Sequence, residues 1–395
     1  MKRLKRIAKM HFFTSITTNY IPKARVLAKT LKKYNSDCIM HIVVSDDLPR
    51  NFDISTEPFD FVWFSEDFIK TENNNKWFFI HNVVELCTAV KAAAALHIFE
   101  KMSINKLIYL DPDIAVFSNL EELFVMLDDN SVLLTPHMTE PAKSEVFINA
   151  DETCCLSHGI YNLGFFAVKN DTNGLKFLNW WNDRLMKWCY DDIPKGLFTD
   201  QKWIDLAVLF FDFIKIIKDV EYNVATWNLE TRKLTGSIQN GLFVNGKVLK
   251  FFHFTGFDSG AHREVLSYHA KKGEDVWKLS VWYEQMLDLN GQSKLGDNTY
   301  KYAFYDNGEK ILQVHRIVFR ERKDVYNYFD NPFGDDCCCW MRGSVLDCQN
   351  EKIFTIIYKW LKYKILYKLM IGEKRVKYRI KYHVFKKVLS RISKI

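Results

Sequence analysis

The sequence predicts an α/β fold with a parallel central sheet. Apolar, strand-like segments alternate with amphipathic segments of helical periodicity, and this alternation implies parallel strands joined by right-handed crossovers. Residues 106–110 (KLIYL) form a short apolar run bounded by polar residues, as in a strand that is covered on both faces. With 395 residues, 48% of them hydrophobic, the chain suffices for one large or two modest folded units. We therefore expect a Rossmann-like sheet with helices on both faces.

The N-terminal segments follow this pattern in order. The first predicted helix has Pro22 in its opening turn, where the missing N–H group is not needed. The helix before residues 106–110 contains four consecutive alanines and neither Gly nor Pro. The expected strands are 10–17, 38–47, 59–65 and 106–110, and the expected helices are 21–34 and 85–102.

The rest of the chain alternates less regularly. The Asn307-Gly308 pair is a hairpin signal. The other expected segments are a strand over 159–170, an aromatic helix over 175–190, irregular structure over 221–232, a strand ending in a Gly-bearing loop over 247–260 and a helix over 276–287.

The positive charge of the chain is concentrated in its last 45 residues. Residues 351–395 hold fourteen Lys and Arg against two Glu, a net of +12, which leaves about −5 for the first 350 residues because the whole chain carries +7. A nucleic-acid-binding core is therefore not expected. Lys and Arg alternate with Tyr, Ile, Leu and Trp in this tail, which favours binding to an anionic membrane surface. The alternatives are a helical hairpin packed on the domain, or an arm for nucleic acid or an acidic partner.

The cysteines and the hydropathy indicate a cytoplasmic protein. The nine cysteines are odd in number and form no C-x-x-C pair, which fits a reducing compartment. The adjacent Cys337, Cys338 and Cys339 cannot all turn toward one zinc ion, so we expect ordinary thiols. No apolar run approaches the roughly 20 residues of a membrane-spanning helix, and the basic N-terminus lacks the features of a signal peptide. The expected location is the cytoplasm, peripheral at the inner face of the cell membrane through the tail.

Two aspartates follow the apolar strand 106–110 directly. Asp111 and Asp113 flank Pro112, which cannot donate a hydrogen bond in a central strand, so the strand is expected to end at about Asp111. Side chains at i and i+2 of an extended segment point the same way, toward the sheet edge where ligands bind. Two converging carboxylates repel unless a cation or a shared proton intervenes. They predict a divalent metal site; the alternative is a loop pair before a helix capped by Ser118.

The chain lacks a glycine-rich phosphate loop. Neither G-x-G-x-x-G nor G-x-x-x-x-G-K-[ST] occurs. The phosphates of a bound nucleotide would have to be held in another way, and a metal ion on Asp111 and Asp113 would suffice.

Four motifs together resemble one enzyme family. "LIYLDPDIAVF", "YNLGFFAVK", "TDQKWID" and "FFHFTG" occur in this order within residues 10–260, which is similar to retaining GT-A glycosyltransferases such as glycogenin and the lipopolysaccharide galactosyltransferases. The chain also resembles bacterial polysaccharide and O-antigen glycosyltransferases. The resemblance implies a mixed, mainly parallel sheet. It also suggests a GT-A catalytic domain over 1–268 and an acceptor-facing C-terminal extension over 269–348. Residues 349–395 are expected to form a basic amphipathic helical tail.

The resemblance implies a metal site of three ligands. Asp111 and Asp113 match the D-x-D motif that holds Mn²⁺ or Mg²⁺ on the donor's diphosphate, and His253 matches a third ligand. Two carboxylates and an imidazole suit Mn²⁺ better than Mg²⁺. The alternative for His253 is a core histidine among aromatic neighbours.

Further residues are matched to the donor sugar. Asp200 and Gln201 match a pair beside the sugar, with the carboxylate on its hydroxyls and the amide near the anomeric carbon; the alternative is an ordinary helix N-terminus. Asn162 and Gly164 match a segment in which a small residue lets the backbone approach the sugar.

Other positions are matched to the remainder of the donor. Lys91 lies where the family has an arginine directed at phosphates and sugar, although the spacing alone suits a helix-surface lysine. Thr14, Ile16 and Asn19 are expected near the base and ribose, and Asp46 is a further candidate there.

One motif departs from the family pattern. The histidine motif normally continues to a Lys-Pro-Trp that contacts the diphosphate, whereas this chain has Asp258 and Ser259. We expect Arg263 or Lys91 to replace that contact. Asp258 is also a candidate general base in an inverting enzyme.

These features predict a metal-dependent glycosyltransferase that transfers a sugar from a nucleotide-sugar donor of the UDP or dTDP type. The acceptor is expected to be a lipid-linked oligosaccharide or surface glycan, and the reaction to proceed with retention. The alternatives are an inverting enzyme that uses Asp258 or Asp200 as base, and a non-catalytic membrane or polyanion adaptor. A nucleotidylyltransferase is disfavoured by the missing Gly-rich loop, and a glycoside hydrolase by the close spacing of the aspartates.

Overall fold

The computed structural model describes residues 9–343 of the chain. The predicted membrane-binding tail, residues 351–395, lies outside this range. The chain forms two compact units that divide between residues 303 and 304. The proposed boundaries at 268 and 348 stay predictions.

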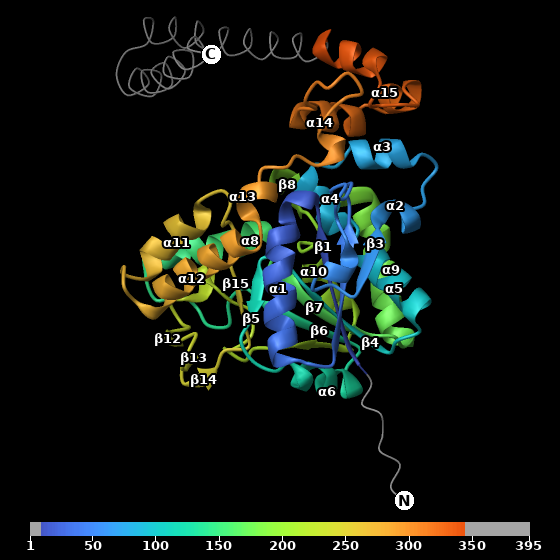
Figure 1. The fold of residues 1–395 in the computed structure, drawn as a ribbon. Coiled ribbons are helices and arrows are strands. Elements are labelled where there is room, and N and C mark those ends of the chain that lie inside the picture. The colour runs from blue at the N-terminus through green and yellow to red at the C-terminus, as the bar shows by residue number, and fades with distance from the viewer. Residues whose placement is uncertain (1–8, 344–395) are drawn as a thin grey trace, which may run out of the picture. The chain divides into compact units, whose positions relative to one another are not determined.

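A seven-stranded mixed sheet lies at the centre of the first unit (Figure 1). β7 runs antiparallel to β4 and β6, and the other neighbouring pairs are parallel. The predicted mixed, mainly parallel sheet is confirmed. From one edge to the other, the strands are β10 (Ile214–Ile216), β6 (Val132–Pro136), β7 (Tyr161–Lys169), β4 (Lys106–Leu110), β1 (Met10–Ile16), β2 (Cys38–Val44) and β3 (Phe61–Phe64).

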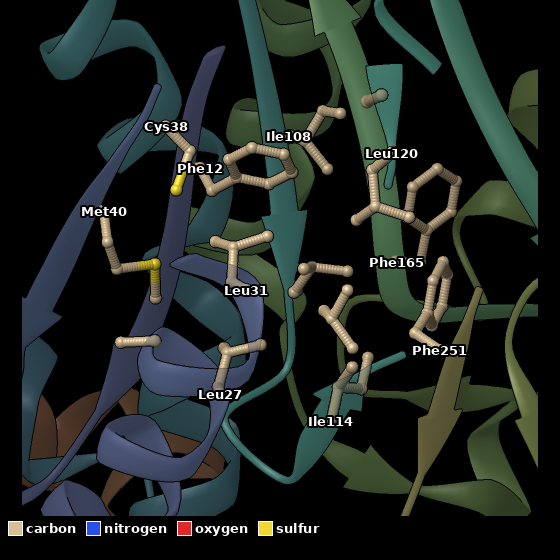
Figure 2. Packing of buried hydrophobic residues seen from close by; sticks show 14 of the residues in the cluster. Phe12, Leu27, Leu31, Cys38, Met40, Ile108, Ile114, Leu120, Phe165 and Phe251 are labelled. Carbon is tan, nitrogen blue, oxygen red and sulfur yellow. The ribbon is translucent and has the colours of Figure 1, made fainter. Parts of the chain in front are cut away.

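One face of the sheet is covered by α1 (Ile21–Tyr34) and α6 (Glu121–Asp129). Figure 2 shows Leu27 and Leu31 of α1 packed near Phe12 and Ile108 of the strands, and these side chains belong to one buried apolar cluster. Burial of this kind contributes about 25 cal/mol for each Å² of apolar surface. The cluster therefore anchors α1 to the strands that carry the candidate site.

The opposite face carries the alternate side chains of the same strands. The Phe166 ring of β7 packs edge-to-face on Trp181 of α9 (Thr172–Trp188), at a centroid distance of 5.1 Å. α5 (Lys91–Met102) packs beside α9. Helices on both faces are thus confirmed. The predicted helix over 85–102 is divided at Val90 into α4 (Val83–Ala89) and α5.

A second, three-stranded sheet joins distant parts of the chain. It consists of β11 (Val224–Ala225), β15 (Phe251–His253) and β5 (Ile114–Val116), in that order. β5 follows the D-x-D segment, so this sheet places the strand that ends at His253 beside it. The segment expected to be irregular, 221–232, contains β11 and a 3₁₀ turn.

The remaining elements surround these two sheets. In chain order they are α2 (Ser65–Phe68), α3 (Asn74–Phe79), α7 (Glu145–Phe147), α8 (Thr153–His158), β8 (Asp191–Asp192), β9 (Leu197–Phe198), α10 (Ile204–Phe210), β12 (Leu234–Ser237), β13 (Gly241–Val244), β14 (Lys247–Val248), α11 (Ala261–His269), α12 (Asp275–Leu289) and α13 (Gln292–Leu295).

The second unit contains α14 (Gln313–Glu321) and α15 (Lys323–Tyr328). The predicted hairpin turn is present: Phe304 and Lys310 form an antiparallel bridge, and Gly308 has a φ of 84°. Within residues 9–343, the cysteines are free thiols. No helix in that range is long and apolar enough to cross a membrane.

Candidate active site

Three potential metal ligands converge at the carboxyl end of β4. Asp111 follows β4, Asp113 precedes β5, and His253 ends β15. Because Ile114 of β5 is paired with His253, the imidazole lies beside both carboxylates. One ligand atom from each of the three side chains lies within 4.8 Å of the others. His253 Nε2 is 3.0 Å from Asp113 Oδ1 and 3.7 Å from Asp111 Oδ2.

The electrostatics of this cluster fit a divalent cation. Burial, the largest single influence, disfavours the charged form of each group. The attraction and hydrogen bond between Asp113 and His253, together with other nearby charges, outweigh it, so the pKa of Asp113 is lowered and the pKa of His253 is raised. The imidazolium thus neutralises carboxylate charge that a metal ion would otherwise neutralise. Two carboxylates and an imidazole form a ligand set that suits Mn²⁺, and Mg²⁺ less well. The residues present therefore fit the predicted metal.

Neighbouring groups hold the ligands in place. The Tyr109 hydroxyl donates a hydrogen bond to Asp111 Oδ1 at 2.5 Å, and burial raises the pKa of Tyr109, which keeps this donor protonated. A Cβ atom on Gly164 would lie 2.4 Å from Cε1 of His253. Glycine at this position therefore lets β7 approach the imidazole ring. The sequence motif assigned Gly164 only to the approach of a sugar.

Lys91 and Asp200 form a buried ion pair next to the ligands. Lys91 Nζ lies 2.9 Å from Asp200 Oδ2 and 3.3 Å from Asp111 Oδ1. Both side chains of the pair are 3% exposed, so the alternative of a helix-surface lysine is wrong. Burial opposes the charge of Lys91, but the carboxylates of Asp111 and Asp200 outweigh it and raise the pKa of Lys91. Burial also raises the pKa of Asp200, against the lowering effect of Lys91.

Asp200 and Gln201 lie in the turn before α10. The N-cap of α10 is Trp203, so the alternative role of Asp200 as the capping residue of this helix is not observed. Thr199, just before the pair, has a left-handed φ of 42°, which is uncommon for a β-branched residue. Gln201 Nε2 donates to the carbonyl of His158 at 3.0 Å.

Sequence reasoning missed a buried polar network in residues 221–232. Asn223 Nδ2 donates to Thr135 Oγ1 and to Asn162 Oδ1, both at 2.9 Å. Arg232 is 1% exposed and donates hydrogen bonds to backbone carbonyls of the same segment. The available signal was the density of Asn, Trp and Arg in a segment without apolar periodicity. This network positions Asn162, which the sequence did predict at the site.

Two cavities adjoin the ligand cluster. The larger cavity, of about 540 Å³, is lined by the residues expected around the donor sugar. The smaller cavity, of about 180 Å³, is lined by residues expected near the base and ribose. The predicted residues that line the larger cavity are Lys91, Asp111, Asn162, Gly164, Asp200, Gln201 and His253. Those that line the smaller one are Ile16, Asn19, Lys91, Asp111 and Asp113.

Two of the expected donor contacts lie away from these cavities. Thr14 is fully buried in β1 and lines neither cavity. The oxygens of Asp46 accept hydrogen bonds from the backbone N–H groups of Thr18, Asp47 and Lys301, at 2.9–3.0 Å. Their roles in donor binding stay predictions.

Arg263 and Asp258, which follow His253 in the chain, are each engaged in an ion pair outside the ligand cluster. Arg263 is paired with Glu284 at 2.6 Å and lines a separate cavity of about 850 Å³. The structure therefore does not bring Arg263 to the candidate metal ligands. Asp258 is paired with Lys23 of α1, and its side chain is 42% exposed.

No protein-family model matches the sequence. The uncharacterized proteins YfnD and YfnF of Bacillus subtilis (strain 168) are 21% and 24% identical to it; the matches cover 78% and 47% of this chain, and 96% and 60% of the relatives.

Solved structures with similarity to the chain include a galactosyltransferase and a glycosyltransferase. A galactosyltransferase LgtC, in complex with donor and acceptor sugar analogs, is 14% identical, with a TM-score of 0.35, over 69% of this chain and 100% of the other. The glycosyltransferase GlyE of Streptococcus pneumoniae TIGR4 is 16% identical, with a TM-score of 0.41, over 75% of this chain and 66% of the other.

Proposed function

We propose that this chain is a metal-dependent glycosyltransferase that moves a sugar from a nucleotide-sugar donor to a glycan acceptor. The observation that carries the proposal is the convergence of Asp111, Asp113 and His253 at the junction of two cavities. The smaller cavity has a size and position suited to part of a nucleoside, and the larger one to a sugar. A site that joins a diphosphate-binding metal to both compartments suits transfer of a sugar from a nucleotide.

Each part of the site has a defined task in this proposal. A metal ion held by Asp111, Asp113 and His253 would stabilise the charge of the leaving diphosphate. The Lys91–Asp200 pair and the amide groups of Asn162 and Gln201 would bind and orient the sugar hydroxyls in the larger cavity. Because these side chains are buried and each is held by an ion pair or hydrogen bond within the protein, they are positioned before the donor arrives.

Transfer with retention is supported because the two carboxylates proposed as the base of an inverting reaction are both engaged in ion pairs. Asp200 is held by Lys91, and Asp258 is held by Lys23. An inverting reaction needs a carboxylate or imidazole that can take the acceptor proton. The larger cavity also contains Asp151, 3.5 Å from His269. Analysis of the product anomer distinguishes retention from inversion. An inverted product whose formation requires Asp151 would contradict retention.

The donor type and the acceptor are proposed from the sequence resemblance. We propose a UDP- or dTDP-type donor and a lipid-linked oligosaccharide or surface-glycan acceptor. The basic residues of 351–395 would hold the protein at an anionic membrane where such an acceptor resides. Co-sedimentation of the full chain with phosphatidylglycerol vesicles, and its absence with phosphatidylcholine vesicles, tests this part.

The central experiment measures donor binding by calorimetry. The full chain is titrated with a panel of nucleotide sugars, with and without Mn²⁺. We expect metal-dependent binding of one donor, lost in Asp113→Asn and His253→Ala, and retained in the exposed control Asp128→Asn. Binding that ignores both the metal and these substitutions would overturn the proposal and favour the adaptor alternative.

A further inference from the structure

A buried ammonium group lies near the metal ligands without a part in the site as described above. Lys23, in the first turn of α1, has a side chain that is 1% exposed. Its Nζ lies 3.7 Å from the centroid of the Tyr20 ring and is paired with the carboxylate of Asp258. A cation buried to this degree loses most of its hydration, so it needs a compensating anion.

This ammonium group contacts a residue in the wall of the smaller cavity. Tyr20, whose ring it contacts, lines that cavity together with Asp111 and Asp113. The cation therefore lies one side chain away from the cavity that Asp111 and Asp113 line.

The partner of Lys23 is placed so that it can be exchanged. Asp258 is 42% exposed and lies in the loop that follows β15. Gly256 and Gly260 on either side of it have φ values of 69° and 79°, in the region that glycine tolerates. The Asp258 side chain therefore already reaches solvent, whereas that of Lys23 does not.

The charges at the site leave a requirement for one more cation. Asp111 and Asp113 would neutralise a divalent ion, and Lys91 is already matched by Asp200. A bound diphosphate would bring further negative charge, and these groups leave no net positive charge to balance it. Arg263, the other residue expected to supply this contact, is paired with Glu284 at a separate cavity.

We propose that Lys23 is a phosphate-binding residue. Its ammonium group is paired with Asp258 until the diphosphate of the donor displaces the Asp258 carboxylate. The inference rests on the proposed function, because it takes the donor to be a nucleoside diphosphate sugar. It assigns the phosphate contact that the sequence left open to a residue of α1. It also gives Asp258 a role as a displaceable counter-ion.

The test compares ligands that differ only in their phosphates. The full chain is titrated with UDP and with uridine in the presence of Mn²⁺, and with dTDP and thymidine in parallel. We expect Lys23→Met to weaken diphosphate binding by roughly tenfold or more, as for a lost charge-assisted hydrogen bond, and to leave nucleoside binding unchanged. Lys23→Arg should restore most of the affinity. Lys29→Met, on the same helix, serves as the matched control.

The role of Asp258 is tested separately. Asp258→Asn removes the competing anion, so we expect tighter diphosphate binding, whereas a merely structural ion pair would make this variant resemble Lys23→Met. Equal binding of UDP by the wild type and Lys23→Met would overturn the inference while the proposed function stands. If the wild type binds none of the diphosphates in a metal-dependent way, the proposed function fails and the inference with it.

Discussion

His253 Nε2 lies 3.0 Å from Asp113 Oδ1, although the two residues belong to different parts of the chain. The contact exists because β15 pairs with β5, with His253 opposite Ile114. The pairing of two three-residue strands thus completes the candidate metal site.

Metal binding should depend on the residue that orients a ligand as well as on the ligands themselves. We expect Tyr109→Phe, which removes the hydrogen bond to Asp111, to weaken Mn²⁺ binding by about 10- to 100-fold, the range for groups that orient metal ligands. Asp113→Asn should reduce binding further. Calorimetric titration with MnCl₂ measures both. Unchanged Mn²⁺ affinity in Tyr109→Phe would show that the hydroxyl does not orient Asp111.

Gly164→Ala should displace His253. The new methyl group would lie 2.4 Å from Cε1 of the imidazole, so the ring or β7 must move. We expect a loss of about 1–3 kcal/mol in the free energy of unfolding, as for other overpacked cores, together with loss of Mn²⁺ binding. Gly343→Ala, which meets no atom within 4 Å, is the matched control. Full Mn²⁺ affinity in Gly164→Ala would contradict the close approach.

Lys91→Met should destabilise the fold strongly. The substitution leaves Asp200 buried and unpaired, and an uncompensated buried charge costs about 3–5 kcal/mol. The double variant Lys91→Met with Asp200→Asn should recover part of this loss, because no net charge then remains in the pair. Urea denaturation of the single and double variants measures the coupling. Strictly additive losses would argue against the ion pair.

Stability should fall as the pH falls, because of His41. Burial, and then the nearby His11, lower the pKa of His41 from its ordinary 6.5 to about 3, so the folded state requires the neutral imidazole. This contribution is fully present above about pH 6.5 and is lost as the pH falls toward 3, at up to about 1.4 kcal/mol for each pH unit. Urea denaturation at several pH values measures the slope.

The variant His41→Gln isolates this effect. It removes the titrating group and also the contacts of His41 with His11 and Trp63, so we expect lower stability at pH 7 but a flatter dependence on pH. A slope equal to that of the wild type between pH 6.5 and 4 would assign the acid sensitivity to other groups.

Local pattern predicted the part of the site that is local in the chain. Asp111 and Asp113 share one strand end, so their convergence follows from the geometry of a single extended segment. The apolar run before them predicted a buried strand, and β4 is that strand. The role of His253 was expected only through the resemblance of its motif, because nothing in its own segment indicates which strand it pairs with.

The sequence by itself determined the fold class, the order of the main strands and helices, and the carboxylate pair, since these depend on periodicity and on contacts between near neighbours. Only the tertiary structure decided that Lys91 is buried against Asp200, that Asn223 supports Asn162, and that Lys23 meets Asp258. Each of these contacts joins segments far apart in the chain. Their partners are set by strand pairing and helix packing, which no local pattern of residues encodes.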